Sequence, residues 1–128
     1  MRVLLDTHAL LWWLAGDKQM SATGRWVIEN EENAVFVSAA SAWEVSTKHR
    51  LGKLPRAGPL ATDFAGVVAS QGFLELPITL EDGQHAGQLA GTHRDPFDRM
   101  LIAQAKRNDL ALISNEVVFD DYGVIRIW

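Results

Sequence analysis

The chain has 128 residues, of which 48% are hydrophobic and 22% charged, so it can bury the core of one domain. We therefore predict a single domain over residues 1–128. The absence of cysteine excludes disulfides, zinc–thiolate sites and thiol catalysis, and it suits a reducing cytoplasm. The net charge of −4 at pH 7 argues against a protein that coats nucleic acid through a broadly basic surface. It is compatible with acidic residues gathered around a metal ion.

The N-terminus begins like a signal peptide, with Met1 and Arg2 followed by the apolar run Val3–Leu5. Asp6 and His8 interrupt that run, and no convincing small-residue cleavage site follows. No stretch approaches the roughly eighteen apolar residues that a membrane-spanning helix requires. We expect a cytoplasmic protein with no membrane partner.

Short apolar runs of strand length alternate with helical periods from the start of the chain. In chain order, the first half predicts a strand at 3–5, a helix from Ala9 to Gly16, a helix capped by Ser21 and running to about Glu31, a strand at 34–37, and a helix from Ser41 to Leu51 with Gly52 as its stop.

The second half continues the alternation after a predicted loop at 55–59. It predicts a helix from Phe64 to Gly72, a strand at 74–76, a helix capped by Thr79 and ended by Gly91, a helix that follows Asp95 and runs through Ala105, a strand at 111–113, and a strand at 124–127 on the sheet edge. The helix through Ala105 is apolar almost all round, so it should be central. This order predicts an α/β fold around a mostly parallel sheet.

Four carboxylates are expected at the carboxyl ends of the predicted strands, which is where open parallel sheets bind their ligands. Asp6 follows the first strand directly, and Glu44 lies in the predicted first turn of the helix after the second strand. Asp98 lies in the first turn of the most apolar helix, and Glu116 follows the strand that ends near Ser114. Four separate segments should therefore deliver a carboxylate to one edge of the sheet.

Such a cluster suits a divalent cation. Crowded carboxylates repel one another and raise one another's pKa values, and a bound cation removes that conflict. Mg²⁺ prefers oxygen ligands, and in phosphodiester hydrolysis it makes a nucleophile from water and neutralises charge on the transition state. The sequence predicts this metal-assisted chemistry and no side-chain nucleophile.

Each acid also has a structural interpretation. Ser41 and Glu44 match a capping box, in which Glu44 would only complete the start of a helix. Asp95 is expected to cap the last predicted helix, with Asp98 favoured there by the helix dipole. Glu116 could lie solvated in a loop. Capping gives no reason for four acids to meet, so we prefer a shared site.

Four segments resemble PIN-domain proteins, and among them the VapC-type toxins of type II toxin–antitoxin pairs. The segments are Leu4–His8, Ser38–Glu44, His93–Ala105 and Leu112–Glu116. Their order and spacing agree over essentially the whole chain. The first three motifs together are highly specific, and the fourth is weaker.

The resemblance implies a three-layer, Rossmann-like α/β/α sandwich and Mg²⁺- or Mn²⁺-dependent endoribonuclease activity. It also implies a homodimer and inhibition by a small antitoxin that binds DNA. By position, Asp6, Glu44 and Asp98 would be the central metal ligands. Glu116 would stand at a fourth acidic position, where many relatives have aspartate and where glutamate adds a methylene.

The same motifs imply supporting residues. Thr7 would support the site through its hydroxyl, and Ser38 would orient the carboxylates. Ser41 would either do the same or cap its helix. Asp95 belongs to the motif, with capping as its better-supported role.

Basic residues near the predicted site are candidates for contacts with RNA phosphates, or else solvated helix ends and partners of the acids. They are Lys48, Arg50, Lys53, Arg94 and Arg99.

The histidines show no metal-ligand spacing and are expected at the surface or in hydrogen bonds; they are His8, His49, His85 and His93. The five tryptophans are expected mostly in the core or at an interface, with stacking on RNA bases the less favoured role.

Two alternatives to a nuclease stay open. A receiver-like signalling domain also binds Mg²⁺ at strand ends, but it needs an acidic pair at the first strand and a lysine after the last core strand. This chain has a single Asp6 and no matching lysine after 111–114. The second alternative is a PIN-like protein that only binds its partner.

Overall fold

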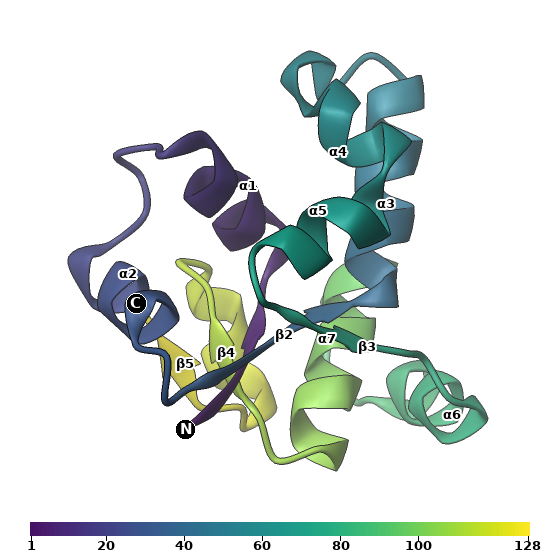
Figure 1. Ribbon diagram of the computed structural model, residues 1–128. Helices are drawn as coiled ribbons and strands as arrows, with labels where there is room; N and C mark the ends of the chain where they lie inside the picture. The colour runs from purple at the N-terminus through teal and green to yellow at the C-terminus, as the bar shows by residue number, and fades with distance from the viewer.

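The computed structural model describes all 128 residues and contains one five-stranded sheet in the order β3-β2-β1-β4-β5. All four strand pairs are parallel, so the predicted α/β class is confirmed and the sheet is parallel throughout. The strands are β1 (Arg2–Leu5), β2 (Ala34–Ser38), β3 (Leu74–Leu76), β4 (Ala111–Ile113) and β5 (Arg126–Ile127). The buried β1 lies at the centre, and its carboxyl end therefore has a strand on each side (Figure 1).

Helices connect the strands and cover the sheet. They are α1 (Thr7–Ala15), α2 (Ala22–Glu29), α3 (Ala39–Arg50), α4 (Gly58–Thr62), α5 (Phe64–Ser70), α6 (Leu80–Gln88) and α7 (Pro96–Arg107), with 3₁₀ turns η1 (Pro55–Ala57) and η2 (Val117–Tyr122). None of the helices is long and apolar enough to cross a membrane.

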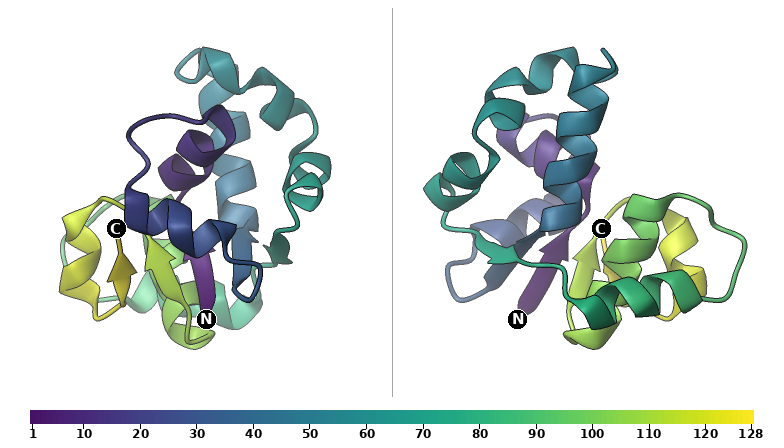
Figure 2. Two further views of the ribbon diagram at one scale, coloured as in Figure 1. Left: turned by 60° about the vertical axis from the view of Figure 1, so that its left-hand side comes forward. Right: turned by 90° about the vertical axis from the view of Figure 1, so that its right-hand side faces the viewer.

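Two apolar clusters lie on opposite faces of the sheet, which confirms the predicted three-layer sandwich. Val3 and Leu5 belong to the cluster under α1 and α2, whereas Leu4 belongs to the cluster under α7. This division follows from the alternation of side chains along a strand. Figure 2 shows α2 on one side of the sheet and α6 and α7 on the other.

The helix α7 is as central as its composition predicts. Leu101, Ile102 and Ala103 are fully buried, and the polar Gln104 is buried with them. Asp95 caps this helix through hydrogen bonds from the Phe97 and Asp98 amides, as predicted. Asp98 is therefore held in the first turn of a rigid helix.

The start of α3 differs from the prediction. The helix begins at Ala39, and the Ser38 hydroxyl accepts the hydrogen bond from the Ala40 amide at 2.9 Å. Ser41 is thus an internal helix residue, and the capping box with Glu44 is wrong. The cause is local: Ser38 is the last residue of β2 and already has the extended backbone that an N-cap requires.

Three other boundaries differ. The predicted loop at 55–59 is helical, because prolines stand in the first turns of η1 and α4 and Leu60 is buried against the core. The helix α6 has the predicted capping box of Thr79 and Asp82 but ends at Gln88. The last strand is shorter than predicted, because only Arg126–Ile127 of the predicted 124–127 pairs with β4.

Candidate active site

The structure places the four predicted carboxylates at the carboxyl edge of the sheet. Asp6 follows β1, Glu44 lies in the second turn of α3, Asp98 lies in the first turn of α7, and Glu116 lies between β4 and η2. The first three are buried, and Glu116 is half-buried. Charges so placed need partners, because burial without compensation is costly.

Asp6 is 2% exposed, and its hydrogen-bond partners are neutral. The Ser114 hydroxyl donates to Asp6 Oδ2 at 2.7 Å, and the Ser114 oxygen accepts from the Glu116 amide at 3.0 Å. The pKa of Asp6 is raised to about 6; burial is the largest cause and the charge of Glu116 adds to it, whereas the hydrogen bond from Ser114 acts in the opposite direction. Ser114 thus holds Asp6 and the backbone of Glu116 together.

Asp98 is in a similar position. His93 Nε2 lies 2.7 Å from Asp98 Oδ2. The pKa of Asp98 is raised to about 7; burial is the largest cause, the hydrogen bond with His93 opposes the shift, and the charges of Asp95, Glu116 and Asp6 add to it. The pKa of Asp98 is raised by Glu116 from the loop after β4 and by Asp6 from the end of β1, so these three segments lie close enough to interact electrostatically.

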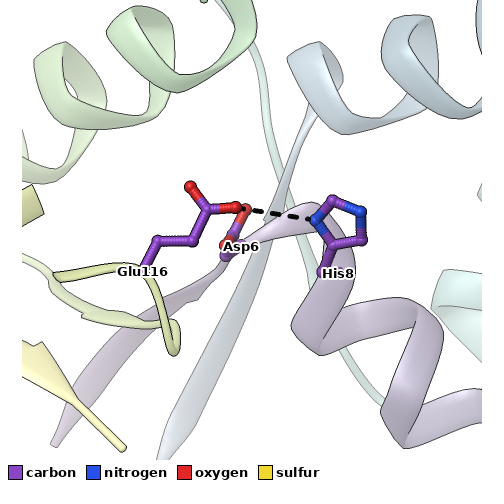
Figure 3. A group of neighbouring side chains, drawn as sticks. All are labelled: Asp6, His8 and Glu116. Atoms are coloured by element: carbon purple, nitrogen blue, oxygen red, sulfur yellow. Dashed lines mark ion pairs between the residues drawn. The ribbon is translucent and has the colours of Figure 1, made fainter. Parts of the chain in front are cut away.

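Asp6, His8 and Glu116 form the tightest group of potential ligands. One ligand atom from each lies within 4.8 Å of the others, and His8 Nδ1 lies 3.8 Å from Glu116 Oε1. Figure 3 shows His8 and Glu116 approaching Asp6 from opposite sides, one from α1 and the other from the loop after β4. Neither Glu44 nor Asp98 belongs to this group.

Glu44 is held by Lys48, one turn later on α3. Burial lowers the pKa of the Lys48 ammonium, but the hydrogen bond and charge of Glu44 outweigh this effect and raise it. The charges of Asp95 and Asp98 act in the same direction, which places Lys48 between the acids of α3 and α7. Lys48 therefore forms an ion pair with Glu44 in this structure, and its contact with an RNA phosphate stays a prediction.

The hydroxyls of Thr7, Ser38 and Ser41 form hydrogen bonds that hold the helices of the site together. Thr7 Oγ1 lies 2.9 Å from Ser41 Oγ, so it joins α1 to α3 and does not contact a carboxylate. Ser38 caps α3 and also donates to the side chain of Gln104 on α7. These buried hydroxyls fix the relative positions of the three helices that carry the site.

The basic residues fall into two groups. Arg50, Lys53 and Arg94 have exposed side chains. Arg99, in contrast, donates to the backbone carbonyls of Ala86, Leu89 and His93, and it thereby joins α7 to α6 and the loop that follows α6. Its contact with an RNA phosphate stays a prediction.

Sequence reasoning missed three residues of this site: His8, His93 and Ser114. The spacing of the histidines along the sequence gives no signal of their partners, which are Glu116 for His8 and Asp98 for His93. Ser114 had a usable signal, since it directly follows the predicted strand at 111–113. A hydroxyl at the carboxyl end of a neighbouring strand is well placed to reach Asp6.

The comparisons with known proteins agree with this architecture. The PIN domain family matches residues 3–125. The chain is 45% identical over 38 residues to ribonuclease VapC16 of Mycobacterium tuberculosis, an alignment that spans 30% of this chain and only 27% of that protein.

Two solved structures are similar over nearly the whole chain. VapC20 of Mycobacterium tuberculosis, described as a sarcin–ricin loop cleaving toxin, has a TM-score of 0.71 at 16% identity and covers 96% of each chain. VapBC2 of Rickettsia felis, bound to a DNA fragment from its promoter, has a TM-score of 0.70 at 14% identity over 98% of this chain and 97% of the other. These likenesses establish the fold, and the family match covers almost every residue. The chain belongs to the PIN-domain family.

Proposed function

We propose that this protein is a divalent-metal-dependent endoribonuclease and the toxin of a VapBC-type toxin–antitoxin pair. One observation carries the proposal: the buried Asp6 and Asp98 carboxylates both have raised pKa values at the carboxyl edge of the sheet, where Glu116 also lies. Perturbed carboxylates gathered in this way are typical of a functional site. The short but 45% identical match to a ribonuclease supports the same reaction class.

The residues present fit Mg²⁺ or Mn²⁺. The donors are carboxylate oxygens from separate segments, and their mutual repulsion is the kind that a cation relieves. Asp6, Asp98 and Glu116 would hold the ion, and Glu44 would complete the set. When bound, the ion supplies Lewis acidity, which lowers the pKa of water and neutralises charge on a phosphate.

The protein's own side chains orient these acids. Ser114 fixes Asp6 by donating to Oδ2, and His93 fixes Asp98 through Nε2. Hydrogen-bonded partners of this kind position ligating groups and tune their basicity. Glu116 is the least buried of the acids, and its extra methylene lets it reach from the loop towards Asp6. Lys48 balances the charge of Glu44.

The substrate and partners follow from the same proposal. Arg50, Lys53 and Arg94 are exposed cations that would contact RNA phosphates beside an otherwise acidic site. A small DNA-binding antitoxin would inhibit the enzyme, and the protein would act as a homodimer in the cytoplasm. The likeness to a VapBC complex supports an antitoxin partner.

The receiver-like alternative is disfavoured by topology. Receiver domains have the strand order 2-1-3-4-5, whereas this sheet has the order β3-β2-β1-β4-β5. A PIN-fold protein that only binds a partner would share this topology. The test below separates it from an enzyme.

The test is cleavage of total cellular RNA, mapped by end sequencing, with Mg²⁺ or with EDTA. Wild type and Asp98→Asn are purified free of any partner and compared at equal concentration. Discrete new RNA ends that require both Mg²⁺ and Asp98 are the expected result. Identical RNA ends from both folded proteins would overturn the enzymatic proposal in favour of a binding protein.

A further inference from the structure

An aromatic pair, the exposed Trp43 and the half-buried Phe97, lies beside the carboxylate site and belongs to neither core cluster. Trp43 precedes Glu44 on α3 and is 62% exposed. Its indole meets the ring of Phe97, which precedes Asp98 on α7, in an edge-to-face arrangement with ring centroids 4.9 Å apart and an interplanar angle of 73°. Each member of the pair is thus the immediate neighbour of a predicted metal ligand.

Lys48 connects this pair to the acids. Its ammonium lies 6.0 Å from the centroid of the Phe97 ring and forms the ion pair with Glu44. Consecutive residues of a helix point about 100° apart, so Trp43 can face solvent while Glu44 is buried. The aromatic pair therefore borders the carboxylates, and the Lys48 ammonium lies near both.

The other tryptophans have different surroundings. Trp12 packs against Trp128, with ring centroids 5.7 Å apart, and both are partly buried on the first core cluster. Trp13 packs against Phe73 and donates its indole N–H to Gln71. Trp26, on α2, is 63% exposed but belongs to the face of the sheet away from α7. Trp43 alone combines high exposure with the neighbourhood of the carboxylates.

We propose that Trp43, supported by Phe97, is a stacking platform for one nucleobase of single-stranded RNA next to the phosphate that is cleaved. The inference rests on the proposed function and adds the substrate class. An edge-to-face contact leaves a face of the indole free, and every nucleobase offers a matching π-face. A duplex keeps its bases stacked on one another, so the platform selects unpaired or splayed nucleotides.

The charges around the platform favour RNA over a protein partner. Lys48 and the buried acids border it directly, whereas the centre of a protein interface is depleted of charged residues. Aromatic rings interleaved with cations are typical of surfaces that bind single-stranded nucleic acid. Lys48 is well placed to meet the phosphate that follows the stacked base.

The experiment measures binding in an inactivated protein. Asp98→Asn alone, and combined with Trp43→Ala, Trp43→Phe or Trp26→Ala, is titrated by fluorescence anisotropy against labelled single-stranded oligoribonucleotides about twelve nucleotides long. An oligomer of equal length with abasic riboses is the second probe. Trp26→Ala is the matched control, because Trp26 is equally exposed and remote from the acids.

We expect Trp43→Ala to weaken binding of the base-bearing oligomers by about tenfold to a hundredfold, which is the range for loss of one stacked base. Binding of the abasic oligomer should be unchanged. Trp43→Phe should retain most of the affinity, and Trp26→Ala all of it.

Three results would overturn the platform. They are unchanged affinity in Trp43→Ala, an equal loss of affinity on the abasic oligomer, and a change of oligomeric state by size-exclusion chromatography with RNA affinity preserved. The last would assign Trp43 to a protein interface. Failure of the wild type to cleave cellular RNA with Mg²⁺ would instead overturn the proposed function. If the wild type cleaves RNA but Asp98→Asn binds none of the oligomers, the stacking proposal for Trp43 is overturned and the proposed function is not.

Discussion

Buried carboxylates at two places in this molecule have opposite electrostatic environments. Asp82, in the first turn of α6, is 1% exposed. Burial alone would raise its pKa, but hydrogen bonds from Thr79 and from the guanidinium of Arg107, 2.6 Å away, lower it. Asp6 and Asp98 are nearly as buried, and their pKa values are raised.

This difference in pKa shows that burial alone does not identify a functional carboxylate. Asp82 has a cationic partner and completes a capping box, so its charge is stabilised within the fold. Asp6 and Asp98 have a hydroxyl and an imidazole as partners, and other acids as neighbours. Neither carboxylate has an arginine or lysine partner of the kind that Asp82 has.

The largest expected effect is on RNA cleavage, which should depend on Asp98 and not on Asp82. Asp98→Asn should reduce the rate of RNA cleavage by at least about 100-fold, because it removes a charged ligand while keeping the shape of the side chain. The melting temperature should stay the same or rise, since a repelled charge is lost. Single-turnover cleavage and thermal unfolding measure the two effects. Cleavage at more than about a tenth of the wild-type rate would contradict the assigned role.

The pH dependence of stability should distinguish the regions next. Asp6 and Asp98 have higher pKa values in the folded protein than their ordinary value of 3.8, so protonation favours the folded state. This stabilisation is complete below about pH 4 and is lost as the pH rises through about 6 to 7.

Metal-free protein should therefore be less stable at pH 8 than at pH 5, by roughly 4 kcal/mol, and Mg²⁺ should restore stability at pH 8. Urea denaturation in EDTA measures this difference. Asp98→Asn is the control, because it should remove the part of the pH dependence of the free energy of unfolding that comes from Asp98. A free energy of unfolding that increases from pH 5 to pH 8 in wild type is inconsistent with the raised pKa values.

Asp82→Asn should show the reverse pattern of Asp98→Asn. It weakens a buried ion pair with Arg107 and the capping box of α6, so the free energy of unfolding should fall by about 1–2 kcal/mol. RNA cleavage per folded molecule should be unchanged. Urea denaturation and the same cleavage assay, run beside Asp98→Asn, test the contrast. Loss of cleavage without loss of stability would mean that Asp82 also belongs to the functional site.

The smallest expected effect comes from the loss of the hydroxyl that orients Asp6. Ser114→Ala removes the hydroxyl that donates to Asp6 and accepts from the Glu116 amide, and the binding of Mn²⁺ or Mg²⁺ should weaken by about tenfold. Isothermal titration calorimetry measures the affinity. Ser114→Thr keeps the hydroxyl and should recover part of it. An unchanged affinity in Ser114→Ala would show that Asp6 needs no such support.

The sequence by itself determined much of this protein, because many of its signals are local. Apolar periodicity placed all five strands, since burial of alternate or successive residues follows directly from the side chains. The caps by Ser21, Thr79 and Asp95 were predictable, as each hydrogen bond spans no more than three residues. Asp6 and Asp98 were found because they stand at element boundaries.

The tertiary structure decided the rest. Ser38, and not Ser41, caps α3, because Ser38 is the last residue of β2 and has an extended backbone where the helix begins. The bond between Ser114 and Asp6 joins residues 108 apart, and the contact between His8 and Glu116 also crosses most of the chain. No local pattern encodes such pairs. They exist only once parallel strands bring their carboxyl ends to one edge, where burial and neighbouring charges set the chemistry of the site.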